Sequence, residues 1–224
     1  MSIQQIGRIV ELSHKMVPRE ENFKLELENY PVEKIMPEIK RQKDAWYILS
    51  EVTMSSHVGT HIEFPYHHLK EGQDAAGFPV EKLIGEAVVL DFSFKKAGEA
   101  ITLDELKAHE HKINKEDILL IRTDCDKFFR TKQWIDFPHM TTEGVQWLID
   151  EKQIKCIGTD GAGIDLLGTD RQPNHVLLFK NGIPMIESMT NLRLLQRERF
   201  LLFILPLRIE GLDACPVRII AIEG

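Results

Sequence analysis

Residues 57–68 read HVGTHIEFPYHH and hold four of the nine histidines of the chain, with one glutamate, one glycine and one proline. Gly59 and Pro65 disfavour a helix here. The zinc-binding helix motif H-E-x-x-H also requires a glutamate at position 58, where the chain has valine. In an extended segment, alternate side chains share one face. The odd-numbered residues on that face are His57, His61, Glu63 and His67.

A straight strand cannot gather these four side chains around one ion. At a rise of about 3.3 Å per residue, His57 and His67 would lie roughly 33 Å apart, whereas metal–ligand bonds are about 2 Å long. Gly59 permits a bulge, and Pro65 ends a hydrogen-bonded ladder. We therefore predict that the segment bends at both residues and curls its ligand-bearing face around a divalent cation.

The competing interpretation, for any one of these histidines, is a solvated or hydrogen-bonded ring on a turn. Because all four side chains share one face of the extended segment, a metal site is favoured. Imidazole and carboxylate ligands suit Zn²⁺, Mn²⁺ or Fe²⁺. His68 would project from the opposite face of the extended segment and is predicted not to be a ligand. The histidines predicted to be ordinary surface or core residues are His14, His109, His111 and His139.

The composition of the 224-residue chain narrows the class of protein. A net charge of −7 and scattered basic residues exclude the basic surface of a nucleic-acid binder. No apolar run approaches the roughly 20 residues that span a bilayer, and residues 1–12 lack the pattern of a secretory signal. Cys125 and Cys156 resemble small core residues, and we expect a cytoplasmic protein. No nucleotide-binding glycine motif is present, so a divalent metal is the one cofactor predicted.

The remaining chain predicts a mixed α/β fold of one domain over residues 1–224. Charged, proline-containing residues 15–45 form an excursion with one short helix near 32–40, which could act as a flap. Thr102 and Glu105 have capping-box spacing, and Asn181-Gly182 can end a helix. Predicted helices are 102–111, 141–152 and 174–182, and predicted strands are 7–14, 46–56, 87–93, 118–124, 154–160, 200–207 and 217–223. The run at 200–207 is interpreted as a buried strand.

Two segments of the chain resemble the motifs of a known family. HVGTHIEFPYH at 57–67 resembles the H-x-G-T-H-x-D-x-P-x-H signature of the cyclase-type metal-dependent hydrolases, which include bacterial kynurenine formamidases and isatin hydrolases. A second family element is a histidine followed twelve residues later by a glutamate, and residues 175–192 read HVLLFKNGIPMIESMTNL. Residues 10–18 and 205–223 resemble the opening and closing strands of the family. The resemblance covers nearly the whole chain except residues 15–45.

The resemblance implies a swivelling β/β/α fold, an enzyme that usually forms homodimers or homotetramers, and one or two metal ions, Zn²⁺ before Mn²⁺. His67 would be the acid/base residue beside the metal. The implied metal ligands are His57, His61, Glu63, His175 and Glu187. The family has aspartate at position 63, and glutamate adds one methylene. The number of ions and any bridging by this carboxylate therefore stay open.

We predict hydrolysis of an amide, cyclic amide or ester bond in a small molecule, with a metal ion that lowers the pKa of bound water and polarises the carbonyl. A metal-dependent cyclase or dehydratase, and a non-catalytic metal-binding or ligand-binding protein, are the alternatives. Asp160 and Asp165 either orient ligand histidines or stabilise a turn. Trp46, Phe64 and Tyr66 are predicted to pack in the core rather than to line a pocket.

Overall fold

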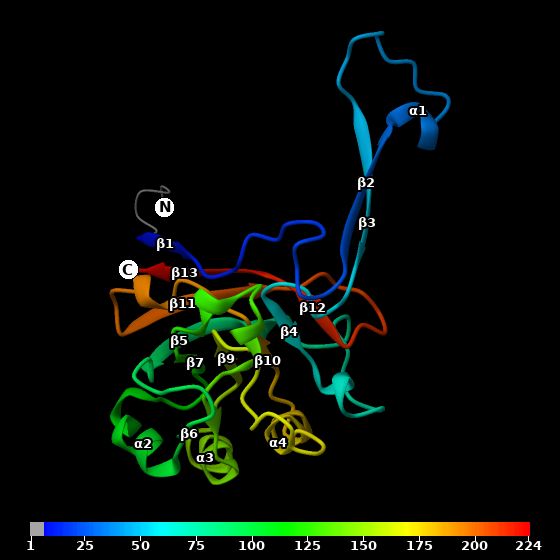
Figure 1. The fold of residues 1–224 in the computed structure, drawn as a ribbon. Helices are drawn as coiled ribbons and strands as arrows, with labels where there is room; N and C mark the ends of the chain where they lie inside the picture. The colour runs from blue at the N-terminus through cyan, green and yellow to red at the C-terminus, as the bar shows by residue number, and fades with distance from the viewer. Residues whose placement is uncertain (1–6) are drawn as a thin grey trace.

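The structure is a computed structural model and describes residues 7–224. Its main feature is a nine-stranded mixed sheet in the order β1-β13-β11-β5-β7-β9-β10-β4-β12 (Figure 1). Its strands are β1 (Arg8–Glu11), β4 (His61–Glu63), β5 (Ile84–Asp91), β7 (Ile118–Arg122), β9 (Cys156–Thr159), β10 (Met185–Glu187), β11 (Arg199–Leu205), β12 (Ala214–Pro216) and β13 (Arg218–Glu223). All the strands predicted for the second half of the chain are confirmed. A parallel centre, β5-β7-β9-β10, is flanked by antiparallel strands.

Three helices lie on one side of this sheet (Figure 1). They are α2 (Leu103–Ala108), α3 (Thr142–Trp147), which continues as a π-helical turn at Leu148–Lys152, and α4 (Pro173–Lys180). A two-stranded sheet of β6 (Ala100–Ile101) and β8 (His139–Met140) accompanies them. The predicted capping box at the start of α2 is confirmed, because the Glu105 amide donates to the Thr102 hydroxyl and the Thr102 amide donates to the Glu105 carboxylate.

Strand position in the sheet explains which residues are buried. In β7, at the parallel centre, Ile118 to Ile121 are all buried, as expected for a strand that is covered on both faces. In β11, burial alternates, and Leu201 and Leu205 are exposed. The prediction of a wholly buried strand at 200–207 is therefore wrong. Leu201 lies on the same face as Val88, which packs with the helices, but among residues 7–224 the helices α2, α3 and α4 cover that face over the middle of the sheet and not at β11.

Residues 25–45 of the predicted excursion lie in a long hairpin, and a role as a flap stays a prediction. Strands β2 (Leu25–Pro31) and β3 (Ile48–Met54) pair antiparallel and project away from the sheet, with α1 (Val32–Ile35) near the tip (Figure 1). We call residues 25–54 the arm. The predicted helix at 32–40 is confirmed only over one turn, and β2 was not predicted, because its charged sequence lacks the apolar alternation of a half-buried strand.

The two ends of the described chain meet in the main sheet, because β1 pairs with β13 along its whole length. The assignment of residues 1–224 to a single domain stays a prediction. Among residues 7–224 no helix is both long and apolar enough to cross a bilayer. The prediction about an N-terminal signal extends to residues 1–6, which lie outside the described residues.

Candidate metal centre

The opening motif bends at the two positions that its sequence predicts. Gly59 has a φ of +69°, a conformation that suits glycine, and the chain then forms the short strand β4. Pro65 begins a 3₁₀ helix, Pro65–His67, which ends the strand. Thr60 fixes the entry to β4, since its hydroxyl donates to the carbonyl of Ser188 and accepts from the amide of His14. The motif therefore curls instead of running straight.

Strand register brings the two distant family motifs together. In the antiparallel pair β4–β10, His61 lies directly opposite Glu187, and directly opposed side chains are neighbours on one face. The His61 Nε2 atom accordingly lies 3.5 Å from Glu187 Oε2. His175 reaches the same place from the first turn of α4. The structure thus brings all five predicted ligands into one cluster.

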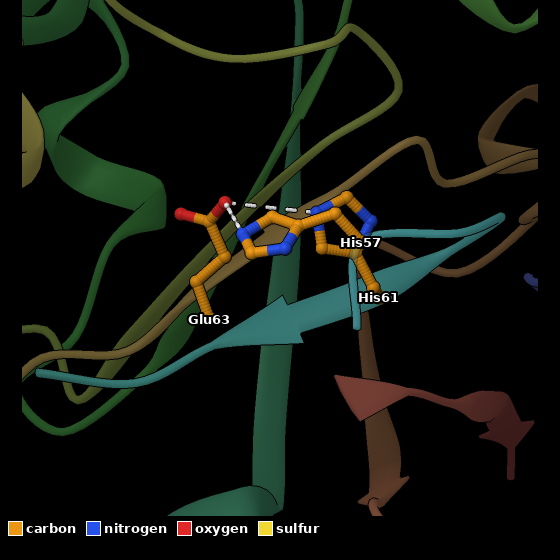
Figure 2. Close-up of side chains that lie close together, drawn as sticks. All are labelled: His57, His61 and Glu63. Carbon is orange, nitrogen blue, oxygen red and sulfur yellow. Dashed lines mark ion pairs between the residues drawn. The ribbon is translucent and has the colours of Figure 1, made fainter. Parts of the chain in front are cut away.

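One oxygen of Glu63 faces a pair of imidazoles. Glu63 Oε1 lies 3.2 Å from His57 Nε2 and 3.6 Å from His61 Nε2 (Figure 2). His61 and Glu63 are buried, and His57 is half-buried at the edge of the site. The ligand atoms of these three residues lie within 4.8 Å of one another, which is close enough to hold one metal ion.

The other oxygen of Glu63 faces a second group. Glu63 Oε2 lies 3.4 Å from His175 Nε2, and the same ring nitrogen lies 3.4 Å from Glu187 Oε1. These three buried residues also hold their ligand atoms within 4.8 Å. The longer side chain at position 63 therefore still places its carboxylate between two ligand groups. This arrangement can hold one ion or two.

The histidine rings are turned so that their Nε2 lone pairs face the cluster. His61 Nδ1 lies 3.0 Å from the carbonyl oxygen of Gly59, and His175 Nδ1 lies 2.5 Å from Asp165 Oδ2. A proton on each Nδ1 leaves Nε2 free to bind a metal. Among the described residues, the buried Nε2 atoms of His57 and His61 and the Oε2 atom of Glu63 have no hydrogen-bond partner. Such groups are costly to bury, so these residues fit a divalent cation.

The electrostatics of the cluster also favour positive charge. Burial lowers the pKa of His61, but the carboxylates of Glu187 and Glu63 outweigh it and raise that pKa to about 10. Burial likewise lowers the pKa of His175, and Asp165 and Glu187 raise it to about 10. For Glu63, burial raises the pKa, and the neighbouring imidazoles outweigh it and hold the pKa well below its usual range. The carboxylates therefore stabilise added positive charge, which a divalent cation supplies.

His67, the predicted acid/base residue, lies at the rim of the cluster. Its Nε2 atom is 3.9 Å from Glu63 Oε1, and its Nδ1 atom is 2.9 Å from Asp213 Oδ2. Asp213 also lies 3.9 Å from His57 Nε2. Sequence reasoning missed Asp213, because it lies far along the chain from the opening motif and belongs to no ligand-spacing motif. Its position just before β12, which pairs with β4, is the signal that only the fold reveals.

A cavity of about 450 Å³ opens onto the cluster. Its apolar wall includes Phe23, from the segment before the arm, Trp134 and Phe137. Phe23 and Trp134 meet edge to face at 6.1 Å between ring centroids, and the Trp134 indole donates to Ser188 Oγ. The described residues that line this cavity include no lysine or arginine. The site thus combines an aromatic wall with a buried group of ligands.

Core packing was predicted for three aromatic residues, and the structure confirms it for one of them. Phe64 is fully buried in the core, as predicted. Trp46 is 85% exposed, because it lies on the arm, where the chain has left the core. Tyr66 is 39% exposed, because the 3₁₀ helix that begins at Pro65 ends the alternation of β4. The prediction of core packing is therefore wrong for Trp46 and Tyr66.

Asp160 and Asp165, whose roles the sequence left open, make different contacts in the structure. Asp165 contacts His175 and also accepts from the backbone amides at the start of α4. Asp160 accepts from the amides of Thr123 and Asp124, so it stabilises the turn after β7. His68, predicted not to be a ligand, stacks on the ring of His175 at 5.6 Å and is in none of the ligand groups.

Comparisons with known proteins agree with this architecture. The Cyclase family model matches residues 10–166. The chain is 31% identical to a kynurenine formamidase of Bacillus thuringiensis (strain Al Hakam), over 76% of this chain and 78% of the relative. It is 27% identical to Cyclase-like protein 1 of Oryza sativa subsp. japonica, over 97% of this chain and 79% of the relative.

Solved structures share the fold. An isatin hydrolase bound to the product analogue thioisatinate superposes with a TM-score of 0.85 at 21% identity, over 99% of this chain and 94% of that one. Isatin hydrolase A from Labrenzia aggregata gives a TM-score of 0.78 at 25% identity, over 96% and 93% of the two chains. With a family model that matches most of the sequence and a site built from both family motifs, this chain belongs to the Cyclase family.

Proposed function

We propose that this protein is a metal-dependent hydrolase that cleaves an amide, cyclic amide or ester bond of a small molecule. The observation that carries the proposal is the position of the Glu63 carboxylate between two groups of ligand atoms, beside an open cavity. The formamidase relative and the isatin hydrolase neighbours, both named for cleavage of non-peptide C–N bonds, support it.

Zn²⁺ is the cation that we propose first, with Mn²⁺ second, because the ligands are three imidazoles and two carboxylates. When bound, such a cation supplies a Lewis acid for the substrate carbonyl and lowers the pKa of water. His57, His61, Glu63, His175 and Glu187 would hold one or two ions. Asp165 would keep the ring of His175 in place through its Nδ1 contact.

We assign proton transfer to Nε2 of His67. With a proton on Nδ1 facing Asp213, Nε2 is free to accept a proton from the attacking water. Water adds its oxygen to the carbonyl carbon, the C–N or C–O bond breaks, and His67 returns the proton to the leaving nitrogen or oxygen. Asp213 orients the ring and stabilises its charged form during this transfer. Phe23 and Trp134 would exclude bulk water from one side of the substrate.

The cavity favours an uncharged aromatic substrate. Phe23, Trp134 and Phe137 offer flat apolar surfaces, and the described lining has no cationic side chain to pair with a carboxylate. The carboxylate of an amino-acid group would lose its hydration there without gaining a lysine or arginine partner from the described lining, which is costly. We therefore place neutral aryl amides and lactams ahead of substrates that carry an amino-acid group.

The decisive experiment combines elemental analysis with a hydrolysis screen. Purified protein should contain zinc or manganese, lose activity with a chelator, and regain it when either metal is added. Isatin and simple cyclic imides test the lactam class. N-formylkynurenine and 2-formamidoacetophenone share the scissile formamide and differ in the amino-acid group, so they test charge selection. Metal below a tenth of an equivalent after repletion would refute the hydrolase, whereas faster cleavage of the zwitterion would refute only the substrate class.

A non-catalytic metal-binding protein and a metal-dependent cyclase or dehydratase are the alternatives to hydrolysis. A crystal grown with metal separates the first, because a closed set of protein ligands would indicate a binder. Product analysis separates the second, since hydrolysis incorporates oxygen from ¹⁸O-labelled water. We also propose a reducing, cytoplasmic location, which is supported by three buried free thiols at Cys125, Cys156 and Cys215.

A further inference from the structure

The segment that leads into the arm, residues 15–24, supplies one aromatic face of the cavity, and we call it the wall loop. Phe23, near its end, lines the cavity that opens onto the ligands. The centroid of its ring lies 6.1 Å from that of Trp134 and 6.4 Å from that of His57. Phe23 is 43% exposed, so its ring has a free face towards the cavity.

The wall loop has little apolar burial to hold this ring in place. None of residues 15–24 is buried as a whole, and none lies in a helix or strand. Segments of this kind open at low free-energy cost unless specific contacts fix them. The exception within the loop is the side chain of Glu21, which is only 1% exposed. A buried carboxylate in an otherwise exposed loop needs a partner of opposite charge.

Arg130 is that partner. Glu21 Oε1 accepts from Arg130 Nε at 3.1 Å and from Arg130 Nη2 at 2.5 Å. Arg130 Nη2 also donates to the carbonyl of Lys15, at the start of the wall loop. Within the described residues, Glu21 Oε2 is buried without a hydrogen-bond partner, so the charge of this carboxylate depends on Arg130. One guanidinium thus contacts two points of the loop.

This ion pair joins the two chain segments that carry the facing aromatic residues of the cavity. Phe23 follows Glu21 by two residues, and Trp134 follows Arg130 by four. Phe129 completes the connection, because its ring lies 5.0 Å from the Arg130 guanidinium and 6.4 Å from the Trp134 ring. The ion pair is therefore placed to set the distance between Phe23 and Trp134.

We infer that Glu21 is a positioning residue that, through Arg130, fixes Phe23 as the aromatic wall that selects aryl substrates. This role deepens the proposed hydrolase function and rests on it. Glu21 does not line the cavity and acts only through its neighbours. Loss of the ion pair leaves a buried group without its partner, which favours an open loop. An aryl ring then loses its contact with Phe23, whereas an aliphatic substrate loses little.

Phthalimide and succinimide test this role, because they share the cyclic imide and differ by the fused benzene ring. Glu21→Gln should raise the KM for phthalimide by about 5- to 10-fold and leave its kcat within about 3-fold of wild type. The KM for succinimide should stay within about 2-fold. Arg130→Met breaks the same ion pair from the other side. The double variant should be no worse than either single variant, because all three lack one shared interaction.

Glu223→Gln is the matched control. The Glu223 side chain is 3% exposed and pairs with Arg8 at 2.8 Å, in β13 towards the other end of the sheet from β4 and β10. This variant should lower the temperature of unfolding and leave the ratio of the two KM values unchanged. An equal change of that ratio in Glu21→Gln and Glu223→Gln would reflect a general loss of stability and would overturn the inference.

The fluorescence of Trp134 tests the position of Phe23 without catalysis. Trp46→Phe and Trp147→Phe leave Trp134 as the one tryptophan of the chain, and its side chain is 9% exposed. In this background, Glu21→Gln should increase acrylamide quenching by about 3-fold, towards the value for Phe23→Ala. Faster quenching in a protein that hydrolyses no imide would support the positioning of Phe23 and refute the hydrolase.

Three outcomes would overturn the inference and leave the hydrolase standing. One is unchanged quenching in folded Glu21→Gln or Arg130→Met. Another is an unchanged ratio of the two KM values in the same variants. The third is an unchanged ratio in Phe23→Ala, which alters an exposed side chain and does not depend on the ion pair for folding.

Discussion

The metal centre and the arm are built from adjacent parts of the chain by opposite means. In the centre, polar side chains are buried, and carboxylates or carbonyls fix their rings. In the arm, apolar side chains are exposed, and the ribbon relies on backbone pairing. Gly59 lies only a few residues after the end of β3, so one short segment separates the two.

The difference shows which parts of this molecule are complete within one chain. The side chains of the centre are arranged within the chain, since the candidate ligand atoms of each group lie within 4.8 Å of one another. The arm leaves Leu27, Val52 and Trp46 exposed. We therefore expect changes in the centre to act on metal binding and turnover at any protein concentration. Changes on the exposed faces of the arm should leave metal binding close to that of the wild type, because no arm residue belongs to the ligand groups.

The largest effect is expected from His61→Ala, which removes a ligand from the middle of the centre. His61 is one of the two imidazoles that lie beside both Glu187 and Glu63, so without it metal should be lost and turnover should fall by about 10³-fold or more. Elemental analysis and steady-state kinetics measure both. A variant that keeps full metal content and activity would remove His61 from the centre.

His67→Ala should separate proton transfer from metal binding. The expected loss in kcat is about 10²- to 10⁴-fold, because general acid–base help is lost, while metal content stays near that of the wild type. Asp213→Asn, which removes the charge facing Nδ1, should shift the pH dependence of kcat and cause a smaller loss. Unchanged kcat in His67→Ala would exclude this residue from the reaction.

A pair of strand substitutions compares the core with the arm directly. Ile62 is fully buried between the metal ligands of β4, and Ile62→Ala should lower the free energy of unfolding by about 2–5 kcal/mol. Val52→Ala, on the exposed face of the arm, should cost no more than about 0.5 kcal/mol in dilute solution. Chemical denaturation measures both, and equal losses would contradict the contrast between the two regions.

Asp165→Asn tests how the ring of His175 is held. Loss of the carboxylate that faces Nδ1 should weaken metal affinity by about 10- to 100-fold. Asp160→Asn is the matched control, because Asp160 is equally buried and contacts the turn after β7 instead of a ligand. Competition with a metal-sensitive dye measures the affinity. Equal weakening in both variants would indicate a general loss of stability.

The smallest effect is expected from His14, a histidine that lies outside both the centre and the arm. Burial lowers the pKa of His14 to about 4, and its ring stacks on Phe129. The unfolded chain therefore binds this proton at a higher pH than the folded chain, and stability falls as pH drops from about 6.5 towards 4. His14→Phe should remove on the order of 1–2 kcal/mol of that fall. Thermal unfolding at several pH values measures it, and parallel curves would refute it.

The sequence predicted the centre better than it predicted the arm. Local backbone rules place His57, His61 and Glu63 on one side of the segment and predict bends at Gly59 and Pro65. The structure confirms both bends. The position of Asp213 depends on the pairing of β12 with β4, which no local pattern encodes.

Strand β2 of the arm was missed for a different reason, although β3 was predicted. Strand patterns in sequence come from burial on one face, and β2 is almost wholly exposed in a single chain. Trp46 was assigned to the core on the same assumption, that a large aromatic residue is buried within its own chain. Patterns that rest on burial within the chain do not identify a strand whose side chains are exposed in that chain.

The pairing of β4 with β10 has a consequence for how the protein matures. A slip of one residue between these strands would turn His61 and Glu187 to opposite faces and dismantle the ligand group. A cation that binds this ligand group would therefore stabilise only the native alignment of the two strands. A shortage of this cation would therefore weaken the preference for the native alignment together with the activity.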